Sequence, residues 1–99
     1  MRVVLSDPAR AELADARRYL DMQQPGLGNA LAREVKQAAM LIAHFPMACQ
    51  VERGEIRRCL LKRFPYKLLY AIRGRQAVVL AIAHQHRDPD YWIDRIPDA

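Results

Sequence analysis

The feature that most constrains the fold is a nine-residue run near the end of the chain, QAVVLAIAH at Gln76–His84. Every residue from 77 to 83 is apolar, and several of them are β-branched or small. The run is far shorter than the roughly 18 apolar residues that cross a bilayer. A short, nearly continuous apolar run of this kind predicts a central β-strand that is covered on both faces.

Two amphipathic helices are predicted upstream of this strand. The letters SDPA at residues 6–9 are typical of a helix start, with Ser6 or Asp7 as N-cap and Pro8 in the first turn. Apolar residues follow at helical spacing until QQPG at residues 23–26 breaks the pattern, and a second apolar stripe runs through residues 27–45 before Pro46. Because few residues join the two helices, they should pack as an antiparallel hairpin.

The remaining segments predict strands. Strand-like runs occupy residues 2–5, 55–63 and 66–73, Gly74 suits a hairpin turn, and residues 46–54 are expected to form a loop. The element order is therefore β-α-α-β-β-β. This order predicts a single α+β domain over residues 1–99, in which an N-terminal strand and an antiparallel helical hairpin pack on a mostly antiparallel sheet of about four strands. A short C-terminal helix or tail should follow.

Positive charge is concentrated in the middle of the chain. The net charge is +5 and the isoelectric point is about 9.7. Residues 53–87 carry nine Lys and Arg residues against one acid, Glu55. Such a concentration of positive charge favours a polyanion or an acidic protein as binding partner.

The cysteines and histidines exclude several kinds of site. Cys49 and Cys59 form no CxxC motif, which excludes a zinc ribbon or a thioredoxin-like redox motif. His84 and His86 lack a third ligand at suitable spacing, so neither a metal nor a cofactor is expected. With no signal peptide visible, we expect a cytoplasmic protein with reduced thiols and no membrane association.

Three stretches together resemble a known family. They are SDPARAELADARRYL at residues 6–20, RRCLLKRFPYKLLYAI at residues 57–72 and VVLAIAHQHRDPDYW at residues 78–92. Their order and spacing are similar to the RelE/ParE superfamily of toxins from type II toxin–antitoxin modules, and in particular to ParE-like toxins, often labelled plasmid stabilisation proteins. The resemblance spans essentially the whole chain.

The resemblance implies a growth-inhibiting toxin with a cognate antitoxin as partner. ParE-like members poison DNA gyrase and are not known to need catalytic residues, whereas RelE-like members cleave mRNA on the ribosome. The Phe-Pro-Tyr and Asp-Pro-Asp-Tyr-Trp pieces favour the ParE-like branch, hence a non-enzymatic inhibitor of gyrase. The mRNA endonuclease is the alternative, and operator DNA would be bound only through the antitoxin. A basic nucleic-acid-binding module is a further alternative, although no recognition helix with base-reading side chains is evident.

If the chain is a RelE-like nuclease, its catalytic residues follow from the family pattern. Arg87 and Lys67 would contact the phosphate, and Tyr91 or His84 would transfer protons. Two features weigh against this chemistry: a tyrosine with its ordinary pKa of about 10 is a poor base, and the strand at residues 55–63 lacks a dense lysine pair. Tyr91 and Trp92 are better explained as a cap on the hydrophobic core than as a base-stacking platform. The ring of His84 is expected to hydrogen-bond a backbone carbonyl oxygen or an acid at the sheet edge.

Two binding surfaces are also expected. The basic residues that would contact the target or a phosphate are Arg57, Arg58, Lys62, Arg63 and Arg87. The C-terminal region, residues 90–99, would complete the gyrase-binding surface. The antitoxin would dock as a helix or an added strand at an apolar groove rimmed by basic residues. The residues expected at that rim are Arg17, Arg18, Arg33 and Lys36.

Overall fold

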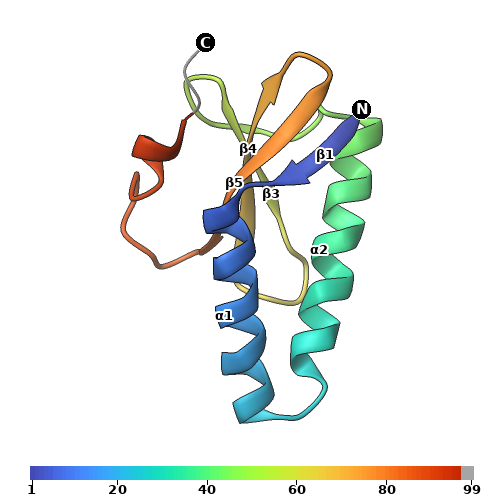
Figure 1. The fold of residues 1–99 in the computed structure, drawn as a ribbon, viewed down its shortest axis with the longest axis vertical. Coiled ribbons are helices and arrows are strands. Elements are labelled where there is room, and N and C mark those ends of the chain that lie inside the picture. The colour runs from blue at the N-terminus through green and yellow to red at the C-terminus, as the bar shows by residue number, and fades with distance from the viewer. Residues whose placement is uncertain (97–99) are drawn as a thin grey trace.

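The computed structural model describes residues 1–96, and Figure 1 shows how its elements are arranged. In chain order they are β1 (Arg2–Leu5), α1 (Asp7–Gln23), α2 (Leu27–His44), β2 (Val51–Arg53), β3 (Ile56–Leu60), β4 (Tyr66–Arg73), β5 (Gln76–His84) and a short 3-10 helix, η1 (Ile93–Arg95). The helices lie side by side on one face of the sheet, and the loop between them is at the end of the molecule away from the N-terminus. Within residues 1–96 no helix is both long enough and apolar enough to span a bilayer.

Local contacts explain both helix starts. The Ser6 side chain accepts a hydrogen bond from the Ala9 N–H at 3.2 Å and caps α1, as expected. Helix α2 has no such cap of its own, and Asp21 of α1 supplies one: its Oδ1 accepts the N–H groups of Gly26 and Gly28 at 3.2 and 2.8 Å. The helices approach closely here, because a Cβ on Gly28 would lie 2.8 Å from the Arg17 carbonyl oxygen. These contacts fix the predicted hairpin.

The strands of residues 1–96 form a five-stranded sheet in the order β1-β5-β4-β3-β2. Strand β1 runs parallel to β5, and the other pairs are antiparallel. This confirms the predicted α+β class, with one strand more than expected. Strand β2 lies in the segment expected to be a loop, because three residues are too short to give an alternating pattern. Its pairing depends on the turn at Gly54, which has a positive φ of 57°.

Two predicted boundaries also differ from the structure. Strand β3 ends at Leu60, and residues 61–65 turn towards β4, so the expected strand over residues 55–63 is too long. Phe45 belongs to the predicted apolar stripe of the second helix, yet its side chain is 60% exposed. It follows the last helical residue, His44, and its φ of −135° and ψ of 65° are not helical, so its side chain does not continue the buried face of the helix.

The sheet buries apolar side chains on both faces. The helical hairpin packs on one face around Leu31, Ile42 and Tyr70. On the other face Trp92, which is 2% exposed, packs against Ile56, Leu69 and alanines of β4 and β5. The segment after β5, residues 85–96, is named here the C-terminal segment. The C-terminal segment covers this second face of the sheet, which agrees with the prediction that Trp92 caps the core.

A β-bulge in β5 shapes the edge of the sheet. The register with β4 shifts between Leu69 and Tyr70, which pair with Ala81 and Val79, so Leu80 is the extra residue. As a result, Leu80 and Ala81 both pack with Trp92, while Val79 and Ile82 pack under the hairpin. Strand β1 pairs with β5 only as far as Val79. Beyond that residue, the backbone N–H and C=O groups on the outer edge of β5 need hydrogen-bond partners other than a strand.

Glu12 of α1 supplies the main partner at this edge. Its Oε1 accepts the Ile82 N–H at 3.1 Å and the Arg95 guanidinium at 2.8 Å, and its Oε2 accepts the Tyr91 hydroxyl at 2.6 Å. Arg95 also donates to the Leu80 carbonyl oxygen at 3.2 Å. One carboxylate therefore joins α1, the bulged strand and the C-terminal segment.

Replacing Glu12 with alanine should loosen the C-terminal segment. The substitution leaves the Ile82 N–H and the Tyr91 hydroxyl without their acceptor, which should cost about 2–4 kcal/mol of unfolding free energy. Trp92 fluorescence in urea titrations measures this loss, and its emission should shift to the red. The matched control is Glu55→Ala, because Glu55 is 60% exposed in its ion pair with Arg73 and its loss should cost less than about 1 kcal/mol. Equal losses in the two variants would contradict this role of Glu12.

Candidate functional site

The four residues proposed for nuclease chemistry line one hollow at an end of the sheet. Lys67 comes from β4, His84 ends β5, and Arg87 and Tyr91 come from the C-terminal segment. The hollow has a volume of about 110 Å³ and also includes Glu52. The fold therefore brings together side chains that are up to 24 positions apart in the sequence, from Lys67 to Tyr91. What they can do there depends on their hydrogen bonds and charges.

Tyr91 is held in its protonated form. Burial raises the pKa of its phenol well above the usual 10.0, and the hydrogen bond to Glu12 and the charge of that carboxylate raise it further. The guanidinium carbons of Arg87 and Arg95 lie 4.0 and 5.0 Å from the centre of the Tyr91 ring. These cations lower the pKa, but burial and Glu12 outweigh them. A phenol in this state is a poor general base at neutral pH.

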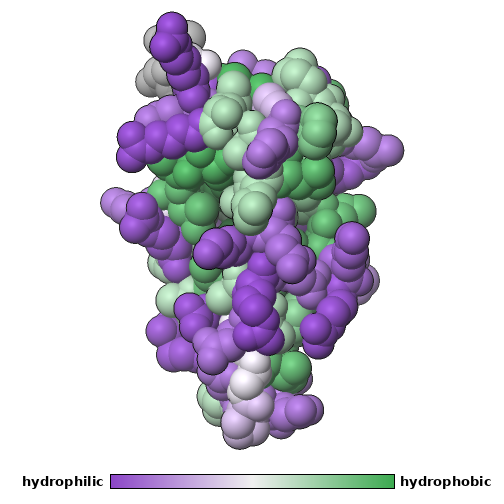
Figure 2. All heavy atoms as spheres, turned by 90° about the vertical axis from the view of Figure 1, so that its right-hand side faces the viewer, coloured by the Kyte–Doolittle hydropathy of each residue, from purple (hydrophilic) through white to green (hydrophobic). Residues whose placement is uncertain are grey.

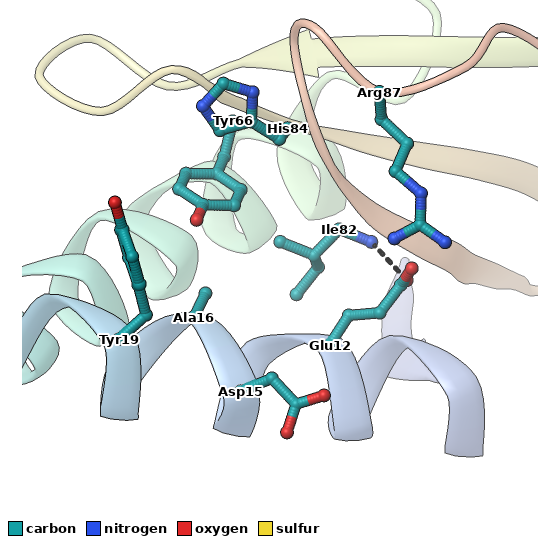
Figure 3. Close-up of a pocket in the computed structure, with 8 residues that line it drawn as sticks. All are labelled: Glu12, Asp15, Ala16, Tyr19, Tyr66, Ile82, His84 and Arg87. Atoms are coloured by element: carbon teal, nitrogen blue, oxygen red, sulfur yellow. Dashed lines mark hydrogen bonds between the residues drawn. The ribbon is translucent and has the colours of Figure 1, made fainter.

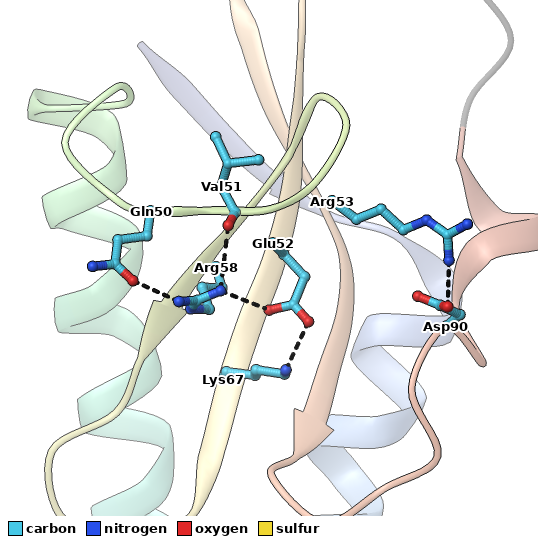
Figure 4. A network of polar contacts seen from close by, with 7 residues as sticks. All are labelled: Gln50, Val51, Glu52, Arg53, Arg58, Lys67 and Asp90. Atoms are coloured by element: carbon cyan, nitrogen blue, oxygen red, sulfur yellow. Dashed lines mark hydrogen bonds and ion pairs between the residues drawn. The ribbon is translucent and has the colours of Figure 1, made fainter.

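Lys67 is paired with an acid. Its Nζ donates to Glu52 Oε2 at 3.0 Å, and both side chains are only 20% exposed. Arg58 reaches the other oxygen of Glu52 at 3.5 Å and also donates to Gln50 and to the Val51 carbonyl oxygen. Figure 4 shows this network, in which the carboxylate of Glu52 lies between the side chains of Arg58 and Lys67. The positive charge of Lys67 is therefore largely balanced within the protein.

His84 has a structural contact of a different kind from the one expected. Its Nδ1 accepts the His86 backbone N–H at 3.1 Å, and its ring meets the edge of the Tyr66 ring at 5.2 Å between centroids. A carbonyl oxygen or an acid was expected as its partner. In residues 1–96 no cluster of three or more His, Cys, Asp or Glu side chains is able to hold a metal ion.

A second pocket, of about 250 Å³, adjoins the hollow through His84 and Arg87, which line both. Figure 3 shows that α1 forms one wall of this pocket and that Arg87 points across it toward Glu12. Glu12 and Asp15 line the α1 wall, with Tyr19 and Tyr66 beside them. Carboxylates in this position repel a phosphate, so the pocket is poorly suited to an RNA backbone.

The five basic residues expected to contact the target or a phosphate divide into two groups. Arg57 donates to the carbonyl oxygens of Met47 and Cys49, and Arg58 holds β2, so both stabilise the chain itself. The side chains of Lys62, Arg63 and Arg87 are exposed. Because Tyr66 at the start of β4 pairs with His84 at the end of β5, these three residues lie at the same end of the sheet.

The four basic residues expected at the antitoxin rim do not form one row. Arg17 donates to Asn29 at 2.8 Å and bridges the two helices, and Arg18 pairs with Asp15 on α1. Arg33 and Lys36 are exposed on α2. These last two share their helix with the groove described next.

An apolar groove of about 230 Å³ lies between α2 and the outer side of β3. Its lining residues are Glu34, Gln37, Ala38, Leu41, Cys59, Leu60, Leu61 and Lys62. Leu41 and Leu60 are 47% and 56% exposed. Figure 2 views the molecule from the side of α2 and shows apolar patches bordered by hydrophilic side chains. Among residues 1–96, β2 pairs with β3 at Ile56 and Arg57, and the Arg58 N–H donates to the Gln50 carbonyl oxygen. On that side only Leu60 among the described residues of β3, at the end of the strand beside the groove, has backbone groups without a strand partner.

Sequence reasoning missed the two acids that organise the hollow. Glu12 lies on the polar face of a helix and Glu52 within an expected loop, so neither pattern signals a buried contact. Glu12 gains its role only because β1 ends before the bulge of β5, and Glu52 because β2 pairs with β3. Both are consequences of strand pairing between segments far apart in the chain.

The fold and the sequence were each compared with those of known proteins. In the solved structure of the chromosomal ParDE toxin–antitoxin system from P. aeruginosa, one chain is 20% identical and superposes with a TM-score of 0.72, covering 85% of this chain and 95% of that one. At this identity the likeness shows the fold alone. No curated protein matches significantly. A family model described as the ParE toxin of the type II toxin–antitoxin system parDE matches residues 3–89, nearly the whole chain, and the protein therefore belongs to the ParE toxin family.

Proposed function

We propose that this ParE-family chain inhibits DNA gyrase by binding it and is neutralised by a cognate antitoxin. The observation that carries the proposal is the state of the hollow: Tyr91 donates to Glu12 and Lys67 is paired with Glu52. Two of the four groups proposed for RNA cleavage, Tyr91 and Lys67, are thus engaged within the protein, whereas Arg87 is exposed. A toxin that acts through a binding surface does not need them free.

Exposed positive charge supports a binding surface at the sheet end. Lys62 and Arg63 stand on the turn between β3 and β4, where their backbone N–H groups donate to Glu34 Oε1 at 2.9 and 3.0 Å. Arg87 projects from the start of the C-terminal segment. A rigid turn with exposed cations suits an acidic protein surface. Residues 97–99, the end of the region assigned to gyrase binding, lie outside the described residues.

The alternative is ribosome-dependent mRNA cleavage, and the observation in its favour is the convergence of Lys67, His84, Arg87 and Tyr91 on one hollow. It would require Tyr91 to give up its hydrogen bond to Glu12 and Lys67 to leave Glu52.

Gyrase inhibition and mRNA cleavage are measured by separate assays. We expect the purified protein to block ATP-dependent supercoiling of relaxed plasmid by gyrase, and cellular mRNA to remain intact. Normal supercoiling with cleaved mRNA would contradict gyrase inhibition.

Charge reversal on the turn should weaken gyrase inhibition. We expect Lys62→Glu combined with Arg63→Glu to raise the half-inhibitory concentration roughly tenfold or more, because like charges across an interface are costly. Arg75→Glu is the matched control, since Arg75 is an exposed arginine in the turn at the opposite end of β5. Supercoiling assays over a toxin titration measure both. If the control loses as much inhibition as the double variant, the turn is not the contact surface.

Removal of the supposed catalytic groups should leave toxicity intact. Lys67→Ala and Tyr91→Phe each delete a group that nuclease chemistry requires, so a nuclease would lose about 100-fold or more in rate. For a gyrase inhibitor we expect unchanged growth inhibition from each variant that is expressed and folded, as checked by circular dichroism. Loss of growth inhibition in a folded Lys67→Ala protein would favour the nuclease.

The groove between α2 and β3 is the proposed site for the antitoxin. It combines exposed Leu41 and Leu60 with the end of β3 that β2 does not pair, so an amphipathic segment can bury its apolar side chains there or extend the sheet beyond β2. Arg33 and Lys36 on α2 favour a segment of acidic character. Arg17 and Arg18 are engaged on α1 by Asn29 and Asp15, and we assign them a smaller share of the contact.

Aspartate in the groove should disrupt antitoxin binding. Leu41→Asp and Leu60→Asp each remove a leucine from the proposed interface, so each should weaken binding at least about tenfold. The assay is calorimetry with the purified product of the open reading frame adjacent to the gene. Met22→Asp is the control, because Met22 is 87% exposed at the far end of α1 and should retain full affinity. An equal loss in this control would contradict the proposed site.

A further inference from the structure

Cys49 lies two residues before β2 and Cys59 lies in β3, so the register of this strand pair places the two cysteines relative to each other. Val51 of β2 is partnered with Arg57 of β3, and the Arg58 N–H donates to the Gln50 carbonyl oxygen at 2.9 Å. In an antiparallel pair, each step back on one strand matches a step forward on the other. Continuing this register by one residue beyond Gln50 and Arg58 brings Cys49 to Cys59. Both thiols are free.

The spacing at this position suits a disulfide. Since Gln50 and Arg58 share a hydrogen bond, the next pair falls at a non-hydrogen-bonded position, where Cα atoms are about 4.5 Å apart and side chains are closest. Disulfides join Cα atoms roughly 4.4–6.8 Å apart. Both side chains point to the same face, because Cys59 belongs to the core under the hairpin and Cys49 packs against that core. Cys49 is also close enough to contribute to the raised pKa of the Cys59 thiol.

The backbone around Cys49 is held in place by two side chains. Arg57 donates to the carbonyl oxygens of Cys49 and Met47 at 2.6 and 3.2 Å, and the Tyr70 hydroxyl donates to that of Pro46 at 2.6 Å. Residues 46–49 are thereby fixed to β3 and β4, although they form no strand themselves.

We propose that Cys49 and Cys59 are a redox modification site that closes into a reversible disulfide on oxidation. The oxidant is a hydroperoxide such as hydrogen peroxide. The thiolate of Cys49 attacks one peroxide oxygen, the O–O bond breaks, and the products are the Cys49 sulfenic acid and, with the thiol proton, one water. The Cys59 sulfur then attacks the Cys49 sulfur, the S–O bond breaks, and the hydroxide takes the Cys59 proton as a second water. Two electrons pass from the thiols to the peroxide.

The order of the two steps follows from burial. Cys49 is partly exposed, whereas Cys59 is only 6% exposed. Burial first, and then the neighbouring Cys49, raise the pKa of the Cys59 thiol to about 12, so little thiolate forms there to meet an external oxidant. Cys49 is therefore the thiol that the peroxide reaches, and Cys59 resolves it. In a reducing compartment the pair stays open until oxidants accumulate.

The test uses the full chain and hydrogen peroxide under native conditions. We expect free thiols to fall from two to none, the intact mass to decrease by two hydrogens, and the protein to keep its oligomeric state. A non-reducing tryptic map should link the peptides of residues 37–53 and 59–62, and a phosphine reductant should reverse the link. The oxidised protein should also unfold at a higher temperature.

Two variants separate this pair from general thiol oxidation. Cys49→Ala should leave Cys59 unreactive in the folded protein at the same peroxide concentration, whereas Cys59→Ala should stop at oxidised Cys49 without an internal link. The proposal is overturned if wild-type protein gives sulfinic acids or intermolecular dimers in place of the link. It is also overturned if both thiols persist after peroxide treatment, or if Cys59 oxidises equally fast without Cys49.

Discussion

The carboxylate of Glu12 accepts a hydrogen bond at the edge of β5, where no strand of residues 1–96 is paired. Strand β1 ends opposite Val79, and the bulge at Leu80 leaves backbone groups of β5 facing outward. Buried backbone groups need partners, and a charged acceptor satisfies more than one of them. Glu12 bonds the Ile82 N–H and also holds Tyr91 and Arg95, so the C-terminal segment is positioned by the same contact that completes the sheet edge.

This arrangement changes the meaning of the residues around the hollow. The tyrosine that a nuclease would use secures the C-terminal segment, and Lys67 anchors β2 through Glu52. Arg57 and Arg58 likewise hold the segment before β3. Much of the basic character of the middle of the chain therefore stabilises the fold. In residues 53–87, exposed basic side chains without an ion pair among the described residues lie on the turn between β3 and β4, at Arg75 and at Arg87. We therefore favour a binding surface over an active site.

Patterns within single segments predicted most of the fold. Helical spacing located both helices, the SDPA start identified Ser6 as a possible cap, and the run at Gln76–His84 identified the strand buried on both faces. The errors have local causes: β2 is too short to show alternation, and Phe45 continues an apolar stripe past the residue where the helix ends. For the candidate site, the sequence named Lys67, His84, Arg87 and Tyr91 but not the acids Glu12 and Glu52 that engage two of them.

The sequence by itself determined the elements other than β2, their order and the family, since these depend on the period of apolar residues and on short motifs read along the chain. Only the tertiary structure decided which charges are balanced and which are exposed. That outcome depends on contacts between different elements, such as Glu12 with Tyr91 and Glu52 with Lys67. Strand register and the bulge at Leu80 set these contacts, and a one-residue shift in either would change every partner.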